Sequence, residues 1–112
     1  MNKYRNQKIT IDGITFDSKL EARRFRELKL LERAKEIEQL QLQPEFELIP
    51  SFKKNGKTIR KTIYKGDFSY IDKRTGKLIV EDTKGYKTKE YILKKKMFEY
   101  KFPELTINEI RR

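Results

Sequence analysis

Two carboxylates and one ammonium group are the residues of this chain whose types and spacing could perform chemistry. Asp82 and Lys84 lie two positions apart at the end of an apolar run, and Asp67 precedes Asp82 by fifteen positions. Side chains at positions i and i+2 of a strand share one face. A second carboxylate from a neighbouring strand would create an acidic metal site beside a cation. That combination suits hydrolysis of a phosphodiester.

The two carboxylates are predicted to meet across a hairpin. If residues 72 and 77 close its turn, Asp67 lies directly opposite Asp82, with Cβ atoms about 5 Å apart. Two carboxylates at that separation repel each other unless a cation neutralises them. A shift of one residue at Gly76 would put the two side chains on opposite faces and remove the pair.

The composition excludes several other chemistries. The chain has 112 residues, of which 36% are hydrophobic and 40% are charged, so we expect a single domain over residues 1–112. Cysteine and histidine are absent. Thiol nucleophiles, disulfides, Ser-His-Asp triads and histidine or cysteine zinc sites are therefore excluded. A bound metal would have oxygen ligands only, which favours Mg²⁺ or Mn²⁺.

The net charge predicts a polyanionic partner. There are 28 Lys and Arg residues against 17 Asp and Glu residues, a net charge of +11. Nucleic acid is the leading candidate, because the basic residues are spread along the chain and do not form one amphipathic membrane-binding helix. No apolar run approaches the ~20 residues of a membrane span. Residues 1–5 lead into polar sequence without a signal peptide, so we expect a cytoplasmic protein.

Turn, cap and periodicity signals predict an α+β (mixed α/β) domain. In order along the chain, the first predicted elements are a hairpin over 8–16 around Asp12-Gly13, a helix over 18–35 whose apolar stripe ends near Ile37, and a strand near 45–48. They are followed by a turn at Asn55-Gly56, a strand over 58–71, a turn at Thr75-Gly76, a strand over 77–84, a helix from Thr88 to Pro103, and a strand over 105–110.

The register that places Asp67 opposite Asp82 in the hairpin around Thr75-Gly76 would also place Lys65 opposite Lys84.

Two further acidic residues have competing interpretations. Ser18 and Glu21 fit a Ser-x-x-Glu capping box, which would explain Glu21 without any catalytic role. Glu21 also borders the apolar face of its helix, which would bring it near the sheet. Glu81 should point away from the face that carries Asp82, so it is predicted to be structural or solvent-facing. A shifted arrangement, in which Glu81 acts together with Lys84, is an alternative that breaks the i, i+2 relation.

These residues, in this order, resemble the PD-(D/E)XK nuclease superfamily. More narrowly, they resemble the small phage- and prophage-encoded nuclease-like (DUF1064-type, resolvase-like) family. The resemblance covers nearly the whole chain, with Gly66 where proline often precedes the first aspartate of the superfamily. It is carried by Ser18 to Glu21 at a helix start, Tyr64 to Phe68 in a strand, Glu81 to Gly85 in the next strand, and the Lys- and Tyr-rich helix from Thr88 to Phe98.

The resemblance implies a fold and a set of roles. The fold would be a restriction-endonuclease-like core, a central mixed sheet flanked by two helices. Asp67 and Asp82 would bind Mg²⁺ or Mn²⁺ together with the Thr83 backbone carbonyl, and Glu21 would bind it directly or through water. Lys84 would orient or help to deprotonate the attacking water and stabilise charge on the phosphate. Flanking phosphates would contact Lys87, Lys89, Lys94 and Lys95.

The leading functional hypothesis is a Mg²⁺-dependent DNA endonuclease of phage recombination, repair or processing, acting in a bacterial or phage-infected cell, with branched DNA as one candidate substrate. Cleavage of both strands would favour a homodimer. A non-catalytic nucleic-acid-binding protein on the same fold is the alternative. Two weaker alternatives are a regulatory protein that binds an acidic partner protein, and a ribosome-associated RNA-binding protein with exposed stacking aromatics.

Overall fold

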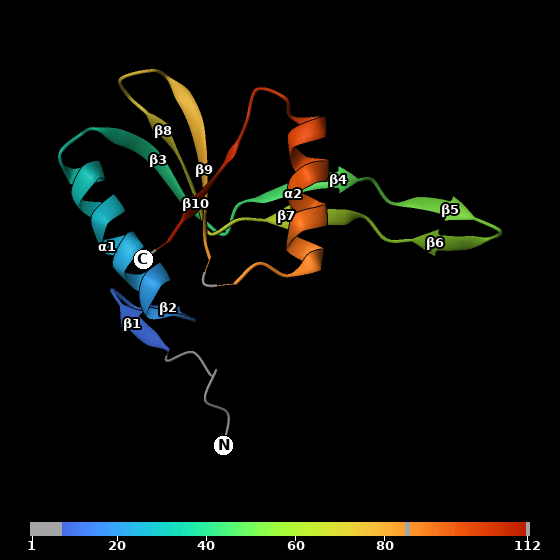
Figure 1. Cartoon of the computed structure of the whole chain (residues 1–112), viewed down its shortest axis with the longest axis horizontal. Helices are drawn as coiled ribbons and strands as arrows, with labels where there is room; N and C mark the ends of the chain where they lie inside the picture. The colour runs from blue at the N-terminus through green and yellow to red at the C-terminus, as the bar shows by residue number, and fades with distance from the viewer. Residues whose placement is uncertain (1–7, 85, 112) are drawn as a thin grey trace.

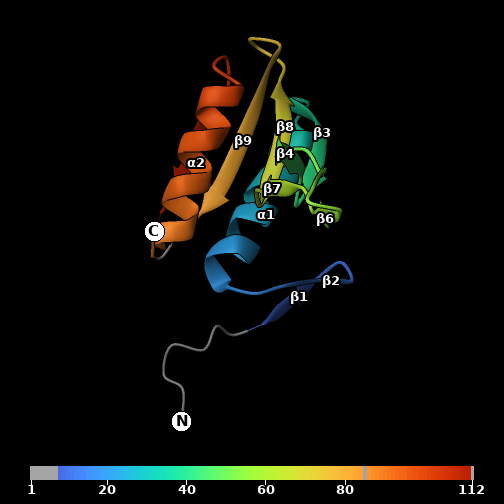
Figure 2. The same cartoon turned by 90° about the vertical axis from the view of Figure 1, so that its right-hand side faces the viewer.

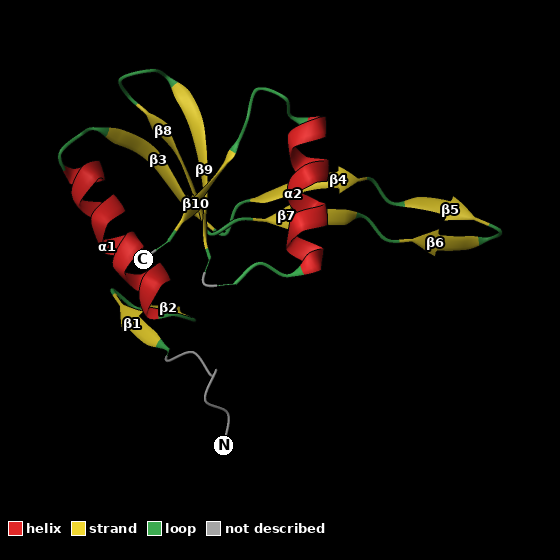
Figure 3. Ribbon diagram, in the orientation of Figure 1, coloured by secondary structure: helices red, strands yellow, loops and turns green. Residues whose placement is uncertain are grey.

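The computed structural model describes residues 8–84 and 86–111, and it forms an α+β fold built from short strands and two helices (Figures 1 and 3). Within these residues, neither helix combines the length and apolar character that membrane crossing requires. Residues 1–5 and Gly85 of the sequence predictions lie outside the described part. The elements are β1 (Ile9–Ile11), β2 (Ile14–Phe16), α1 (Lys19–Arg33), β3 (Ile37–Leu42), β4 (Glu45–Ile49), β5 (Phe52–Lys54), β6 (Lys57–Ile59), β7 (Thr62–Lys65), β8 (Phe68–Asp72), β9 (Lys77–Thr83), α2 (Lys89–Lys101) and β10 (Ile107–Ile110).

A four-stranded mixed sheet organises the molecule. Its strand order is β10-β9-β8-β3, with β10 parallel to β9 and the other neighbours antiparallel. Helix α1 packs with Phe68 and Tyr70 of β8, while α2 packs with Val80 of β9 and Ile107 of β10. Figure 2 shows α2 running alongside β9, and the β1–β2 hairpin below the start of α1. The predicted N-terminal hairpin, central mixed sheet and two helices are thus confirmed.

Helix α1 begins where the capping signal predicts and ends earlier than predicted. The Ser18 hydroxyl accepts a hydrogen bond from the Glu21 N–H at 3.1 Å, which satisfies one free donor of the first turn. The helix stops at Arg33, and Lys35 takes a positive φ of 63°. Ile37 then begins β3, a strand that the sequence reading missed because Ile37 also fits the spacing of the helical stripe.

Helix α2 follows its sequence signals closely. The Thr88 side chain accepts a hydrogen bond from the Tyr91 N–H at 3.0 Å, and Tyr91 and Phe98 are the buried side chains of the helix. Its last residue is Lys101, two before Pro103, which cannot continue a helix. The buried aromatic residues bring one end of α2 next to β9.

The predicted single strand over 58–71 is wrong. This segment is divided into β6, β7 and β8. Gly66 separates β7, which pairs with β4, from β8, which belongs to the four-stranded sheet. The Gly66 N–H donates to the Pro44 carbonyl at 3.0 Å, and a Cβ at Gly66 would lie only 3.3 Å from the Tyr64 hydroxyl oxygen. Lys65 accordingly lies opposite Glu45, not opposite Lys84 as predicted.

The predicted register of the β8–β9 hairpin is confirmed. Asp72 lies opposite Lys77 and Phe68 opposite Glu81, so Gly76 closes the turn without a shift. Asp67 lies just beyond the last pair, and its N–H donates to the Glu81 carbonyl at 3.0 Å. The side-chain alternation of β9 therefore stands as predicted, with Asp82 on the face opposite to Glu81.

Candidate functional site

Asp82 and Lys84 form the centre of the candidate site. Asp82 is 4% exposed, and the Lys84 ammonium lies 3.0 Å from its Oδ1 atom. The same ammonium lies 4.0 Å from the centroid of the Tyr91 ring, where the face of the ring attracts a cation. The predicted i, i+2 pair is therefore a real contact, and Tyr91 of α2 helps to hold the lysine in place.

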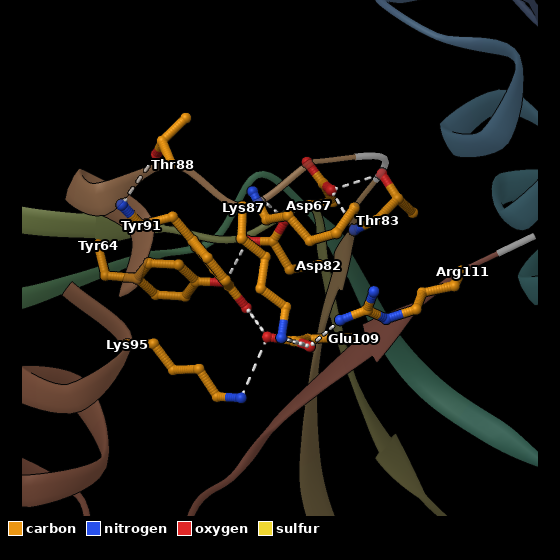
Figure 4. Close-up of polar contacts among 11 residues, drawn as sticks. Tyr64, Asp67, Asp82, Thr83, Lys87, Thr88, Tyr91, Lys95, Glu109 and Arg111 are labelled. Atoms are coloured by element: carbon orange, nitrogen blue, oxygen red, sulfur yellow. Dashed lines mark hydrogen bonds and ion pairs between the residues drawn. The ribbon is translucent and has the colours of Figure 1, made fainter. Parts of the chain in front are cut away.

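Tyr64 of β7 holds the other oxygen of the same carboxylate. Its hydroxyl donates a hydrogen bond to Asp82 Oδ2 at 2.5 Å, as Figure 4 shows. Tyr64 is 2% exposed, and burial and the adjacent Asp82 carboxylate raise the pKa of its hydroxyl, which keeps it protonated. Sequence reasoning treated Tyr64 as a strand residue within a motif and assigned it no contact with the site.

Asp67 lies outside the paired residues of the β8–β9 ladder, so the predicted Asp67–Asp82 pair is not part of it. Its Oδ2 atom accepts hydrogen bonds from the Thr83 N–H at 2.7 Å and from the Thr83 hydroxyl at 2.8 Å (Figure 4). This contact holds the Asp67 side chain against Thr83, which is the last residue of β9 and the neighbour of Asp82 in the chain. The two aspartates are thus brought to the same end of the sheet, because Asp67 binds Thr83, the residue that directly follows Asp82.

Burial and charge work against ionisation of Asp82. Burial raises the pKa of Asp82 to about 6, and the negative charge of Asp67 adds to the rise, while hydrogen bonds from Tyr64 and Lys84 oppose it. A positive charge beyond that of Lys84 would favour the ionised form. A bound cation would therefore stabilise the ionised form of the Asp82 carboxylate.

Glu21 lies on α1, and its carboxylate lines a different hollow from Asp82. That hollow has a volume of about 210 Å³ and is lined by β1–β2 hairpin residues, Glu21, Leu42 and Gln43. Burial raises the pKa of Glu21 to about 7, with the charges of Asp67, Asp17 and Asp82 adding to the rise. Glu21 is therefore within electrostatic reach of both aspartates, although it does not line the hollow that Asp82 lines.

The helix cap does not occupy the Glu21 carboxylate. A full capping box requires this side chain to accept from the Ser18 N–H. Among the described residues, the only hydrogen bond between the two runs from the Glu21 N–H to the Ser18 hydroxyl. The Glu21 side chain thus remains available for another role, which the capping interpretation alone did not predict.

The acidic side chains of the described residues do not form a metal site with three ligands. Across residues 8–84 and 86–111, no group of three acidic side chains is arranged to hold a metal ion. Mg²⁺ is commonly held by one or two carboxylates and keeps several of its water molecules. Asp67 and Asp82 fit that requirement in chemistry and in charge, whereas the predicted participation of Glu21 is not visible in the geometry.

A cleft opens beside the Asp82 and Lys84 pair. Its volume is about 310 Å³, and its walls come from β7, the end of β9 and the first turn of α2. Both positively and negatively charged side chains reach it. The lining residues are Ile63, Tyr64, Lys65, Asp82, Lys84, Thr88, Glu90, Tyr91 and Lys94.

Three of the four lysines predicted to contact phosphates are already in ion pairs. Lys87 and Lys95 lie 2.9 Å and 3.1 Å from oxygens of Glu109, and Lys94 lies 3.2 Å from Glu90. Lys89 is exposed at the start of α2. Their contact with DNA stays a prediction, and it would have to compete with these pairs for all but Lys89.

Glu109 of β10 was missed by the sequence analysis and organises this basic region. Its carboxylate also accepts hydrogen bonds from the Tyr91 hydroxyl at 2.8 Å and from Arg111 at 3.0 Å (Figure 4). Burial would raise the pKa of Glu109, but hydrogen bonds from Lys87, Tyr91, Lys95 and Arg111 hold it well below its usual value. Because Tyr91 also contacts Lys84, Glu109 is linked to the site through one tyrosine.

Glu81 is structural, and the alternative that it faces solvent is wrong. It is 1% exposed, and Arg24 of α1 donates to both of its oxygens at 2.7 Å and 2.6 Å. The Tyr70 hydroxyl adds a third hydrogen bond at 2.5 Å. This bidentate pair ties α1 to β9 on the face opposite Asp82. Arg24 lies 57 positions from Glu81 in the chain, so no local sequence signal identifies it as the partner.

Comparison with known proteins identifies one family. The family described as "Protein of unknown function (DUF1064)" matches residues 1–112. No curated protein and no solved structure matches the chain.

Proposed function

We propose that this chain, which belongs to the DUF1064 family, is a metal-dependent endonuclease that hydrolyses phosphodiester bonds in DNA. The observation that carries this proposal is the buried Asp82 carboxylate, paired at 3.0 Å with the Lys84 ammonium at the end of β9, with Asp67 beside it. Two carboxylates that can hold a metal, together with a compact cation, suit metal-dependent hydrolysis of a phosphodiester.

Asp67 and Asp82 are proposed to hold the metal, with the Thr83 carbonyl as a further ligand and Glu21 acting directly or through water. The oxygen-only donor set favours Mg²⁺ or Mn²⁺. When bound, such an ion lowers the pKa of a coordinated water and polarises the phosphate. The raised pKa of Asp82, caused by burial with Asp67 adding to it, supports a cation at this position.

Lys84 is proposed to act on the scissile phosphate. Its ammonium is held between Asp82 and the Tyr91 ring, so little reorganisation is needed for it to face a bound anion. A preorganised charge stabilises the negative charge that develops in the transition state. Its side chain is 20% exposed and lines the cleft, which leaves it accessible to a phosphate.

DNA is the proposed substrate, and the net charge of +11 supports it. A restriction-endonuclease-like core would agree with the mixed sheet and the position of the two aspartates at its end. Branched DNA, a role in phage recombination or repair, and a homodimer that cuts both strands are proposals that rest on the resemblance to the PD-(D/E)XK superfamily.

A non-catalytic nucleic-acid-binding protein is the second candidate. It is favoured by the satisfied state of the acidic groups: Asp82 is bound by Tyr64 and Lys84, and Asp67 is bound by Thr83. In that case the carboxylates would only stabilise the end of β9. The two candidates differ in one respect, which is whether a divalent cation interacts with Asp67 and Asp82.

Cleavage of linear, nicked and four-way-junction DNA with Mg²⁺, Mn²⁺ or EDTA tests the proposal. The protein is compared with Asp82→Asn and with Asp72→Asn, a control in the same hairpin whose carboxylate binds Arg74 at the turn. We expect metal-dependent cutting by the parent and by Asp72→Asn, and a loss of at least about 100-fold in Asp82→Asn. Equal cutting by all three proteins would reject the assigned site.

Metal binding is measured separately from cleavage by thermal unfolding with and without Mg²⁺. A ligand that binds only the folded state stabilises it, by about 2.7 kcal/mol at a concentration 100 times its dissociation constant. We expect Mg²⁺ to raise the melting temperature of the parent and of Asp72→Asn but not that of Asp82→Asn. If the protein binds DNA but does not cut it, and Mg²⁺ does not raise its melting temperature, the non-catalytic candidate is supported.

A further inference from the structure

The β5–β6 hairpin is an arm that projects away from the rest of the molecule (Figures 1 and 3). Phe52 lies opposite Ile59, and Lys54 lies opposite Lys57, on either side of the turn. The turn residues Asn55 and Gly56 both have positive φ, 52° and 74°. This is the two-residue turn that matches the twist of a hairpin, so the arm is a well-formed β-ribbon.

Packing does not explain the arm. Every residue from 49 to 61 is exposed, and Phe52 and Ile59 are 46% and 41% exposed. An isolated two-stranded hairpin is only marginally stable in water. The twelve residues at 50–61 therefore contribute little to the core of the protein, and a binding role would account for their projection.

The charge of the arm identifies the chemistry of its partner. Residues 50–61 include five basic residues and no acidic residue. Lys54 and Lys57 lie directly opposite each other, an arrangement that destabilises a free hairpin. In the described part of the chain, none of these five side chains is within ion-pair distance of a carboxylate. The five are Lys53, Lys54, Lys57, Arg60 and Lys61.

We propose that this arm enters the major groove of duplex DNA. The major groove of B-form DNA is about 12 Å wide and admits a two-stranded ribbon. The major groove of an A-form RNA helix is deep and narrow, and side chains do not reach into it. This inference deepens the proposed function and rests on its assignment of DNA as the substrate. A second copy of the chain is disfavoured as the partner of this arm, because the five basic residues of the arm would meet a chain whose net charge is +11; a dimer formed through another surface is not affected.

The arm is joined directly to the candidate site. β7 carries Tyr64, which binds Asp82, and β7 follows β6 after a two-residue break. At about 3.3 Å per strand residue, the turn at Gly56 lies at most about 26 Å from Tyr64 along the chain. One turn of DNA is about 34 Å long. The arm could therefore contact DNA that is bound in the cleft at a point less than one helical turn away from the cleft.

Binding assays in EDTA test the arm without any contribution from cleavage. The variant Lys54→Ala/Lys57→Ala is compared with Lys73→Ala/Lys77→Ala, which removes the same charge from the exposed β8–β9 turn. The probes are duplex DNA and duplex RNA of equal length, measured by fluorescence anisotropy over a range of salt concentrations. We expect about tenfold weaker DNA binding by the arm variant, and a salt dependence reduced by about two counterions relative to the control.

Each outcome separates the arm from the active site. Equal DNA affinity and salt dependence in the two variants would overturn the arm proposal, even if the protein cuts DNA. An arm-dependent affinity without metal-dependent cutting would retain the arm and reject the nuclease. Equal arm dependence for duplex RNA would reject the major groove as its location. Loss of a dimer in the arm variant, seen by sedimentation and without a change in DNA affinity, would assign the arm to a second copy.

Discussion

The hydroxyl of Tyr64 lies 2.5 Å from Oδ2 of Asp82, while the Lys84 ammonium lies 3.0 Å from Oδ1. Both oxygens of one buried carboxylate are therefore held by side chains from different parts of the fold. Tyr64 comes from β7, which has left the main sheet, whereas Asp82 and Lys84 come from β9 and the residue after it. The site thus depends on the break at Gly66 that turns β7 toward β4.

Replacement of Tyr64 by phenylalanine should destabilise the protein. The change leaves one oxygen of a buried carboxylate without its donor, at a cost of about 1–3 kcal/mol. Urea unfolding in EDTA would measure the loss. The control is Tyr86→Phe, because Tyr86 is 81% exposed and should change stability by less than about 0.5 kcal/mol. Equal stability of the two variants would mean that the Tyr64 hydroxyl contributes nothing to holding Asp82.

Replacement of Lys84 by methionine should remove cleavage and spare DNA binding. The variant keeps most of the side-chain volume and loses the charge proposed to act on the phosphate, so we expect a decrease in cleavage rate of at least about 100-fold. Lys65→Met is a matched control, because Lys65 lines the same cleft without contacting Asp82 in the described structure. Comparable cleavage by both variants would remove Lys84 from the proposed mechanism. Circular dichroism checks that both are folded.

Removal of Arg24 should be more destabilising than its position on a helix surface suggests. Arg24→Ala leaves Glu81 buried without its ionic partner, and breaking a buried pair costs about 3–5 kcal/mol. Arg23→Ala, at the exposed neighbouring position, should cost less than about 0.5 kcal/mol. The double variant Arg24→Met/Glu81→Leu should recover much of the loss, because neither partner then remains buried and unpaired. Similar chemical denaturation midpoints for the two single variants would contradict this assignment.

Glu109 should make stability depend on pH in the acidic range. Its pKa is held below the ordinary value of 4.5, with burial opposed by four hydrogen-bond donors. The ionised form is favoured in the folded state, so its stabilisation is present above pH 4.5 and is lost as the pH falls below that value. Glu109→Gln should therefore lose less stability than the parent between about pH 6 and about pH 3. Parallel pH profiles of the two proteins would argue against the prediction, with the exposed Glu104→Gln as control.

The sequence alone predicted the features that depend on neighbouring residues. Ser18 and Thr88 cap their helices, and Asp12-Gly13 turns the first hairpin, because each signal involves hydrogen bonds or backbone angles within a few positions. The β8–β9 register was also predictable, since the turn alone determines which residues of a hairpin lie opposite each other. The contact between Asp82 and Lys84 agreed with the same local alternation of a strand.

Only the tertiary structure decided which distant groups meet. Tyr64 is 18 positions from Asp82, and Arg24 is 57 positions from Glu81. Their pairing depends on which elements pack together, and no local signal specifies that. Ile37 likewise fits both a helical stripe and the start of β3, and β8 as its strand partner decides between them. The candidate site could therefore be named from the sequence, whereas the surroundings that hold its charges required the fold.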